Sequence, residues 1–107
     1  MAAKSIIIAV TMPNQKIANK IGEHLINARL IACYQDLGKI KSVYFWQNKK
    51  TKANEILVLL IALKSNFSRI EKAIKKLHPY EVPQIIAFEA SQISKDYASW
   101  ISFGSIK

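Results

Sequence analysis

The sequence predicts an α+β fold, in which a four-stranded antiparallel sheet carries two helices on one face. Apolar runs of strand length, rich in β-branched residues, occupy residues 4–11, 55–64 and 82–89. Apolar residues recur at helical spacing in the stretch after the first run and in the stretch after the second. With only three glycines and three prolines, the 107 residues contain no linker, and we expect one domain over residues 1–107.

The first half of the chain alternates between strand and helix signals. Residues 4–11 are the first strand, and Asn14 is a plausible cap for a helix that runs to about residue 28. Residues 30–35 are expected to be extended, then to bend, and residues 40–47 to be extended again. In that second piece, one face carries Ile40, Ser42, Tyr44 and Trp46.

The second half repeats the pattern. The polar, lysine-rich residues 48–54 are predicted to be a hairpin connection before the strand at 55–64. Ser65 or Asn66 then caps a helix that His78 and Pro79 end, because a residue before proline avoids helical angles. A last strand at 82–89 and a short helix at 97–103 complete the order β-α-β-β-α-β plus a C-terminal helix. This is the ferredoxin-like arrangement.

The third strand is apolar on both faces, although two helices cover only one face of such a sheet. Leu57, Leu59, Ile61 and Leu63 alternate with Ile56, Val58, Leu60 and Ala62. Exposing four such side chains would forfeit roughly 6–12 kcal/mol, which rivals the stability of a small domain. We therefore predict a homo-oligomer that buries the second face, with Tyr44 and Trp46 joining it. The alternative is that a loop or the C-terminal helix folds over this face.

Charge and apolar content exclude some classes of protein. The net charge of +9 raises the question of nucleic acid, but the cations are dispersed and nearly all are lysines, so we interpret them as a solvated surface. The third strand also offers no aromatic residue on which a base could stack, so we rank nucleic acid last. The longest apolar run has eight residues (Ile56–Leu63), too short to span a membrane. Cys33 is the only cysteine, so no disulfide forms within the chain, and we expect a cytoplasmic protein.

Few residues suggest chemistry. No motif pairs a nucleophile with a base, and we predict no catalytic residue and no enzyme activity. The segment at residues 78–83 (HPYEVP) holds polar groups on a stiff backbone between two prolines. A thiolate, an imidazole and a carboxylate suit copper or zinc, which makes Cys33, His78 and Glu81 a candidate metal set without a spacing signature.

Four stretches resemble the CutA divalent-cation tolerance family. They are VTMP at 10–13, RLIAC at 29–33, SVYFW at 42–46 followed by Lys49, and HPYEVPQI at 78–85. Tyr97 and Trp100 are similar to the family's closing Y-x-x-W. The resemblance covers residues 5–103, nearly the whole chain.

The resemblance implies a ferredoxin-like fold packed as a homotrimer through the sheets, with a role in tolerance to copper and other divalent cations and no established catalytic activity. Cys33 matches the cysteine proposed to bind metal in the family, and His78 and Glu81 are carried over as candidate ligands. No metal is expected to be required for folding. The residues assigned to a pocket or interface are Tyr44, Trp46, Tyr80, Tyr97 and Trp100.

The chain departs from the family pattern at four positions, the first of which is Gln35, where asparagine is common. Gln47 and Asn48 stand where Glu-Gly is usual, and Gln84 replaces a glutamate, so two carboxylates are lost. A second hypothesis is therefore a regulatory trimer similar to the PII signalling proteins, with a small organic ligand in the inter-subunit clefts. Under that hypothesis, Tyr44, Trp46, Tyr80 and lysines would line the pocket around an organic anion.

Overall fold

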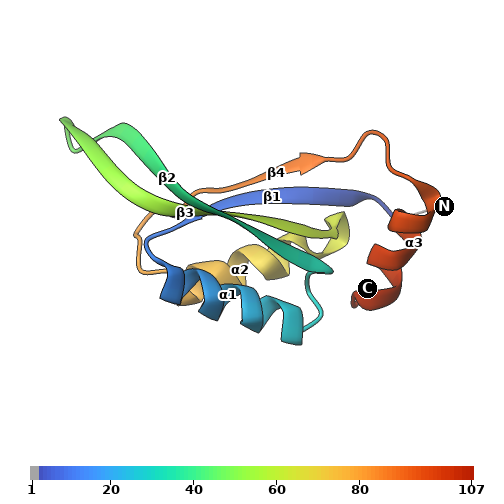
Figure 1. Ribbon diagram of the computed structural model, residues 1–107. Coiled ribbons are helices and arrows are strands. Elements are labelled where there is room, and N and C mark those ends of the chain that lie inside the picture. The colour runs from blue at the N-terminus through green and yellow to red at the C-terminus, as the bar shows by residue number, and fades with distance from the viewer. Residues whose placement is uncertain (1–2) are drawn as a thin grey trace.

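The computed structural model describes residues 3–107 as a sheet with helices on one face and a further helix at one end (Figure 1). The sheet order is β2-β3-β1-β4, and every neighbouring pair is antiparallel. The predicted ferredoxin-like fold is therefore confirmed. The elements are β1 (Ser5–Met12), α1 (Gln15–Asn27), β2 (Cys33–Trp46), β3 (Lys49–Leu63), η1 (Lys64–Asn66), α2 (Phe67–Leu77), β4 (Ile85–Glu89) and α3 (Lys95–Gly104).

The main core lies between the sheet and the pair α1 and α2. Alternate residues of β1 and β3 point toward the helices because successive side chains of a strand face opposite sides of a sheet. Each fully buried aliphatic side chain contributes about 1.5–3 kcal/mol. The central members are Ile8, Val10, Val58, Leu60, Ile21, Leu25, Ile70 and Ile74, all fully buried.

The helix ends follow the capping predictions in part. The Asn14 side chain accepts a hydrogen bond from the Ile17 N–H at 2.9 Å, as a cap should. Asn66 precedes α2 but does not cap it with its side chain. Its amide instead donates to the Ile106 carbonyl at 2.8 Å and so ties the C-terminal segment to the start of α2. His78 ends α2, as predicted.

The predicted hairpin connection at residues 48–54 is wrong. Only Gln47 and Asn48 form the turn, with φ angles of 50° and 65°, and Lys49 already pairs with Trp46. Two successive left-handed residues give a turn whose twist matches that of the strands, so the polar lysine-rich residues continue the ladder. β2 is also one continuous strand, because the predicted bend is only a bulge between Asp36 and Gly38.

The last two elements differ from prediction by a few residues. β4 begins at Ile85 rather than residue 82. Pro83 explains the delay, because it has no N–H to donate to the ladder. α3 is longer than predicted, from Lys95 to Gly104, and the Ser94 hydroxyl caps it by accepting from the Tyr97 N–H. None of the helices described over residues 3–107 has the length and apolar character needed to cross a membrane.

The side of the sheet away from α1 and α2 is covered only at one end. There Ile101 of α3 packs against Ile61 and Leu63, and all three are buried. The C-terminal helix α3 thus covers part of the face that we predicted another copy of the chain would bury. The rest, which we call the open face, stays wholly or partly exposed and comprises Ile7, Leu57, Leu59, Ile86 and Phe88.

Candidate functional site

A pocket of about 650 Å³ lies where the β2–β3 hairpin leaves the body of the sheet. Its walls come from β1, β2, β3 and the connection between α2 and β4. The volume is in the range of small-molecule sites. The lining residues are Thr11, Ser42, Val43, Tyr44, Trp46, Glu55, Tyr80, Glu81, Val82 and Gln84.

His78 fixes the segment that closes this pocket. Its Nε2 lies 2.8 Å from the Thr11 carbonyl oxygen, which can only accept, so Nε2 carries the proton. The Tyr80 N–H donates to Nδ1 at 3.2 Å, and the two rings lie 4.7 Å apart. Both nitrogens of the buried imidazole are therefore engaged within the chain, and they hold Tyr80 against the end of β1.

Glu55 and Tyr80 set the electrostatics of the pocket. Glu55 is only 5% exposed, although it belongs to the face that bears Tyr44 and Trp46. Partial burial raises the pKa of the Tyr80 hydroxyl above its ordinary value, and the neighbouring Glu55 carboxylate raises it further. Sequence reasoning placed Glu55 only at the start of a strand. Glu55 shares the aromatic face because it pairs with Ile40, a register that the unpredicted turn at Gln47 and Asn48 sets.

The sequence-predicted metal set does not come together within one chain. His78 lies at the Thr11 end of β1 and Glu81 lines the pocket, whereas Cys33 pairs with Ile61. Thr11 pairs with Leu57 of β3, so the His78 end and Cys33 lie four residues apart along β3, which is about 13 Å. Within residues 3–107, no three His, Cys, Asp or Glu side chains are grouped to hold a metal ion. One chain therefore does not fit a divalent metal by itself.

Cys33 lies beside the smaller core rather than the pocket. Its half-buried side chain packs near Ile61 and Ile101, and its Sγ contacts the Tyr34 carbonyl at 3.7 Å. A metal bound to this thiolate would need further ligands that the described residues 3–107 do not place there.

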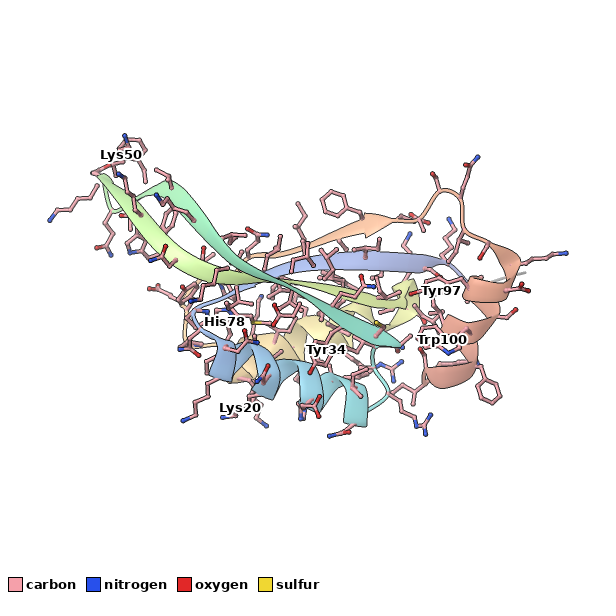
Figure 2. The ribbon with its side chains drawn as sticks, in the orientation of Figure 1. Lys20, Tyr34, Lys50, His78, Tyr97 and Trp100 are labelled. Atoms are coloured by element: carbon pink, nitrogen blue, oxygen red, sulfur yellow. The ribbon has the colours of Figure 1, made fainter. Side chains whose placement is uncertain are left out.

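The aromatic candidates separate into two groups. Tyr44, Trp46 and Tyr80 all line the pocket. Tyr97 and Trp100 stack on each other at 5.4 Å on α3, at the far end of the molecule from Lys50 and the hairpin tip (Figure 2).

The charge of the pocket is opposite to that of the whole chain. Two carboxylates, Glu55 and Glu81, line it, and no lysine, arginine or histidine does. The lysines Lys39, Lys41, Lys50 and Lys52 alternate onto the other face of the hairpin. The expectation that lysines would line this pocket around an organic anion is therefore not met by the lining of a single chain.

Comparison with known proteins identifies the family. The family model described as "CutA1 divalent ion tolerance protein" matches residues 6–103. The divalent-cation tolerance protein CutA of Pyrococcus horikoshii is 32% identical over 96 residues, 90% of this chain and 93% of the relative. The corresponding protein of Thermus thermophilus is 30% identical over 95 residues, 89% and 92% of the two chains. The crystal structure of CutA1 from Oryza sativa superposes with a TM-score of 0.96 at 26% identity, covering 99% of this chain and 97% of the other. The chain belongs to the CutA1 divalent ion tolerance family.

Proposed function

We propose that this chain acts as a homotrimer packed through its sheets, in the cellular response to copper and other divalent cations. Its role is binding rather than catalysis. The metal-ion role comes from the family, and the assembly from the open face. The lone cysteine suits a cytoplasmic location, which is part of the proposal.

The open face is the observation that carries the assembly. Ile86 and Phe88 of β4 are 49% and 57% exposed. β1 lies between them and the half-buried Leu57 and Leu59 of β3, and its Ile7 on the same face is also exposed. These residues form one contiguous apolar patch across β3, β1 and β4, and such patches mark interaction surfaces. Other copies of the same chain would bury it, and the clefts between copies would then adjoin the pocket.

The metal is the less constrained part of the proposal. Cys33 and Glu81 remain the proposed ligands, but each would need partners from a second copy. His78 would join them only if its bond from the Tyr80 N–H opened. Binding at inter-subunit sites therefore depends on assembly.

Two measurements test this proposal. Sedimentation at micromolar concentration should show a particle of three times the 12.1 kDa chain mass. A folded monomer would contradict the assembly. Calorimetry with Cu(II) and with Cu(I) should show uptake by the native protein that falls in the Cys33→Ser and Glu81→Gln variants. Uptake that is absent, or unchanged in Cys33→Ser, would contradict the role of the thiol.

A second function is favoured by the pocket itself. Its volume and its three aromatic walls suit a small organic ligand better than a bare ion. A PII-like regulatory or assembly module, in which the ligand sits near the subunit clefts, would use this site. Ligand-dependent change in the Trp46 fluorescence would support it, and a pocket filled by a neighbouring copy would exclude it.

A further inference from the structure

The geometry points to a small organic cation, an ammonium or a guanidinium on an apolar body, as the ligand of the pocket formed by Tyr44, Trp46, Tyr80, Glu55 and Glu81. This inference assigns a ligand class to the second function proposed above and rests on it. It does not require the metal site.

Glu55 is a buried acidic residue in the wall of the pocket. The residue is 5% exposed and forms no salt bridge among residues 3–107. Withdrawing a carboxylate from water is costly unless a cation or several donors compensate. Its neighbour in the pocket is the Tyr80 hydroxyl, whose pKa is raised first by burial and then by the Glu55 carboxylate beside it. The pocket therefore contains an acceptor for a positive charge.

Three aromatic side chains form part of the pocket wall. Tyr44, Trp46 and Tyr80 reach the pocket from β2 and from the braced segment after His78. Ring faces attract cations by about 0.5–2 kcal/mol, and the ring of Trp attracts them more strongly than that of Tyr. The rings and the carboxylates thus both favour a positively charged ligand, and the rings also bury the apolar part of that ligand.

The ring content also separates an organic cation from a metal. Divalent metals need several oxygen, nitrogen or sulfur ligands in a compact shell. The faces of the rings supply none of these, and residues 3–107 offer no group of three His, Cys, Asp or Glu side chains placed to hold a metal ion. A cavity of about 650 Å³ is also far larger than a dehydrated ion needs. An ammonium or guanidinium with a carbon skeleton uses both the charge and the volume.

Paired probes test the charge requirement. Choline is compared with its neutral isostere 3,3-dimethyl-1-butanol, and n-butylammonium with 1-butanol. Methylguanidinium is the third cation, and acetate is the anion control. The chain has two tryptophans, so the Trp100→Phe variant leaves Trp46 as the sole tryptophan reporter. We expect at least one choline- or butylammonium-type cation to bind at least tenfold more tightly than its neutral counterpart.

Matched variants locate the binding. Glu55→Gln preserves shape and should weaken cation binding at least fivefold, while Trp46→Leu, followed by calorimetry, should do the same. Glu71→Gln is the control, since Glu71 pairs with Lys75 on α2 outside the pocket. Circular dichroism confirms that each variant is folded. Equal weakening by Glu71→Gln would show a general charge effect and overturn the assignment.

The outcomes distinguish this inference from the metal proposal. Cations that bind no better than the neutral probes, or acetate that binds more tightly, would overturn the organic-cation site. Cu(II) or Zn(II) that displaces a bound cation and loses affinity in Glu55→Gln would assign the pocket to metal instead. A trimer that binds copper through Cys33 but none of the organic cations would leave the metal function intact and refute the present inference.

Discussion

The Tyr80 hydroxyl lies beside the Glu55 carboxylate in the pocket, and its raised pKa makes a titration prediction. The folded-state pKa of Tyr80 is raised, so folding favours the protonated phenol. That contribution to stability is complete below about pH 10 and is lost as the pH rises through the folded pKa.

The difference in tyrosinate absorbance between the native protein and Tyr80→Phe should therefore titrate above pH ~10. Glu55→Gln should lower this pKa, since it removes the negative charge but leaves the burial. Asp96→Asn, on α3 and outside the pocket, is the control and should not move it. A Tyr80 pKa that is unchanged in Glu55→Gln would show that the two groups do not interact.

Gly22 makes a second residue-scale prediction, because it permits a close approach of α1 to Tyr34. A Cβ at Gly22 would lie 2.8 Å from two carbons of the Tyr34 ring. That ring packs on the core, and its hydroxyl donates to Glu23, so it has little freedom to move. Overpacking costs about 1–3 kcal/mol, whereas replacing glycine by alanine within a helix gains about 1.

Gly22→Ala should therefore destabilise the native protein by about 1 kcal/mol net. In a Tyr34→Leu background, the same substitution should stabilise it by about 1 kcal/mol, because only the helix propensity remains. Urea unfolding of the four proteins at one chain concentration measures the cycle. The same sign in both backgrounds would contradict the contact.

For single residues, the sequence could identify the unusual segment at residues 78–83 but not which hydrogen bonds its side chains form. The two prolines predict that residues 78–83 are stiff. They do not show that the Thr11 carbonyl and the Tyr80 N–H occupy both nitrogens of His78, because the contact between Thr11 and His78 joins residues 67 apart in the chain. Glu55 was likewise visible only as a polar residue before an apolar run.

Among the elements, the β2–β3 hairpin is where local chemistry and structure disagree most. Its lysine-rich residues resemble a loop in composition, yet they form a ladder through Trp46 and Lys49 (Figure 1). A two-residue turn needs left-handed backbone at both positions, a requirement that Gln47 does not reveal in sequence. Neighbouring strands, rather than residue preference, determine where this hairpin turns.

The turn makes an element-scale prediction. Gln47→Val places a β-branched side chain at φ 50° and should cost about 1–2 kcal/mol. Replacing Gln47 and Asn48 by Asn and Gly should stabilise the hairpin by about 0.5 kcal/mol. Lys52→Val, on the exposed ladder beside the turn, is the control and should be tolerated. Urea unfolding measures all three, and a tolerated Gln47→Val would contradict the turn.

For the whole molecule, the sequence predicted that both faces of β3 are apolar, but not which element covers each part of them. The alternation at residues 56–63 requires two buried faces in any antiparallel arrangement. Which part α3 covers depends on where the chain returns after β4, and no local pattern encodes that. The structure places Ile101 over Ile61 and Leu63 and leaves Leu57 and Leu59 only half-buried, with β1 between them and the exposed residues of β4.

The open face makes the last prediction, which concerns assembly. Phe88 lies opposite Ile7 on this face and is 57% exposed in the single chain. A carboxylate there would be buried without a partner if copies pack through the sheets, at a cost of several kcal/mol for each copy. Phe88→Glu and Ile86→Glu should therefore shift sedimentation from trimer to monomer.

The control variant introduces the same carboxylate on the helical layer, on the other side of the sheet from the open face. Lys72→Glu lies on the exposed side of α2, away from the open face, and should sediment as the native protein does. Because burial of the patch would stabilise each chain, the monomeric variants should also unfold at lower urea concentration than Lys72→Glu. Trimers that persist in both Phe88→Glu and Ile86→Glu would show that copies associate through another surface, and the inter-subunit metal ligands proposed for Cys33 and Glu81 would lose their structural basis.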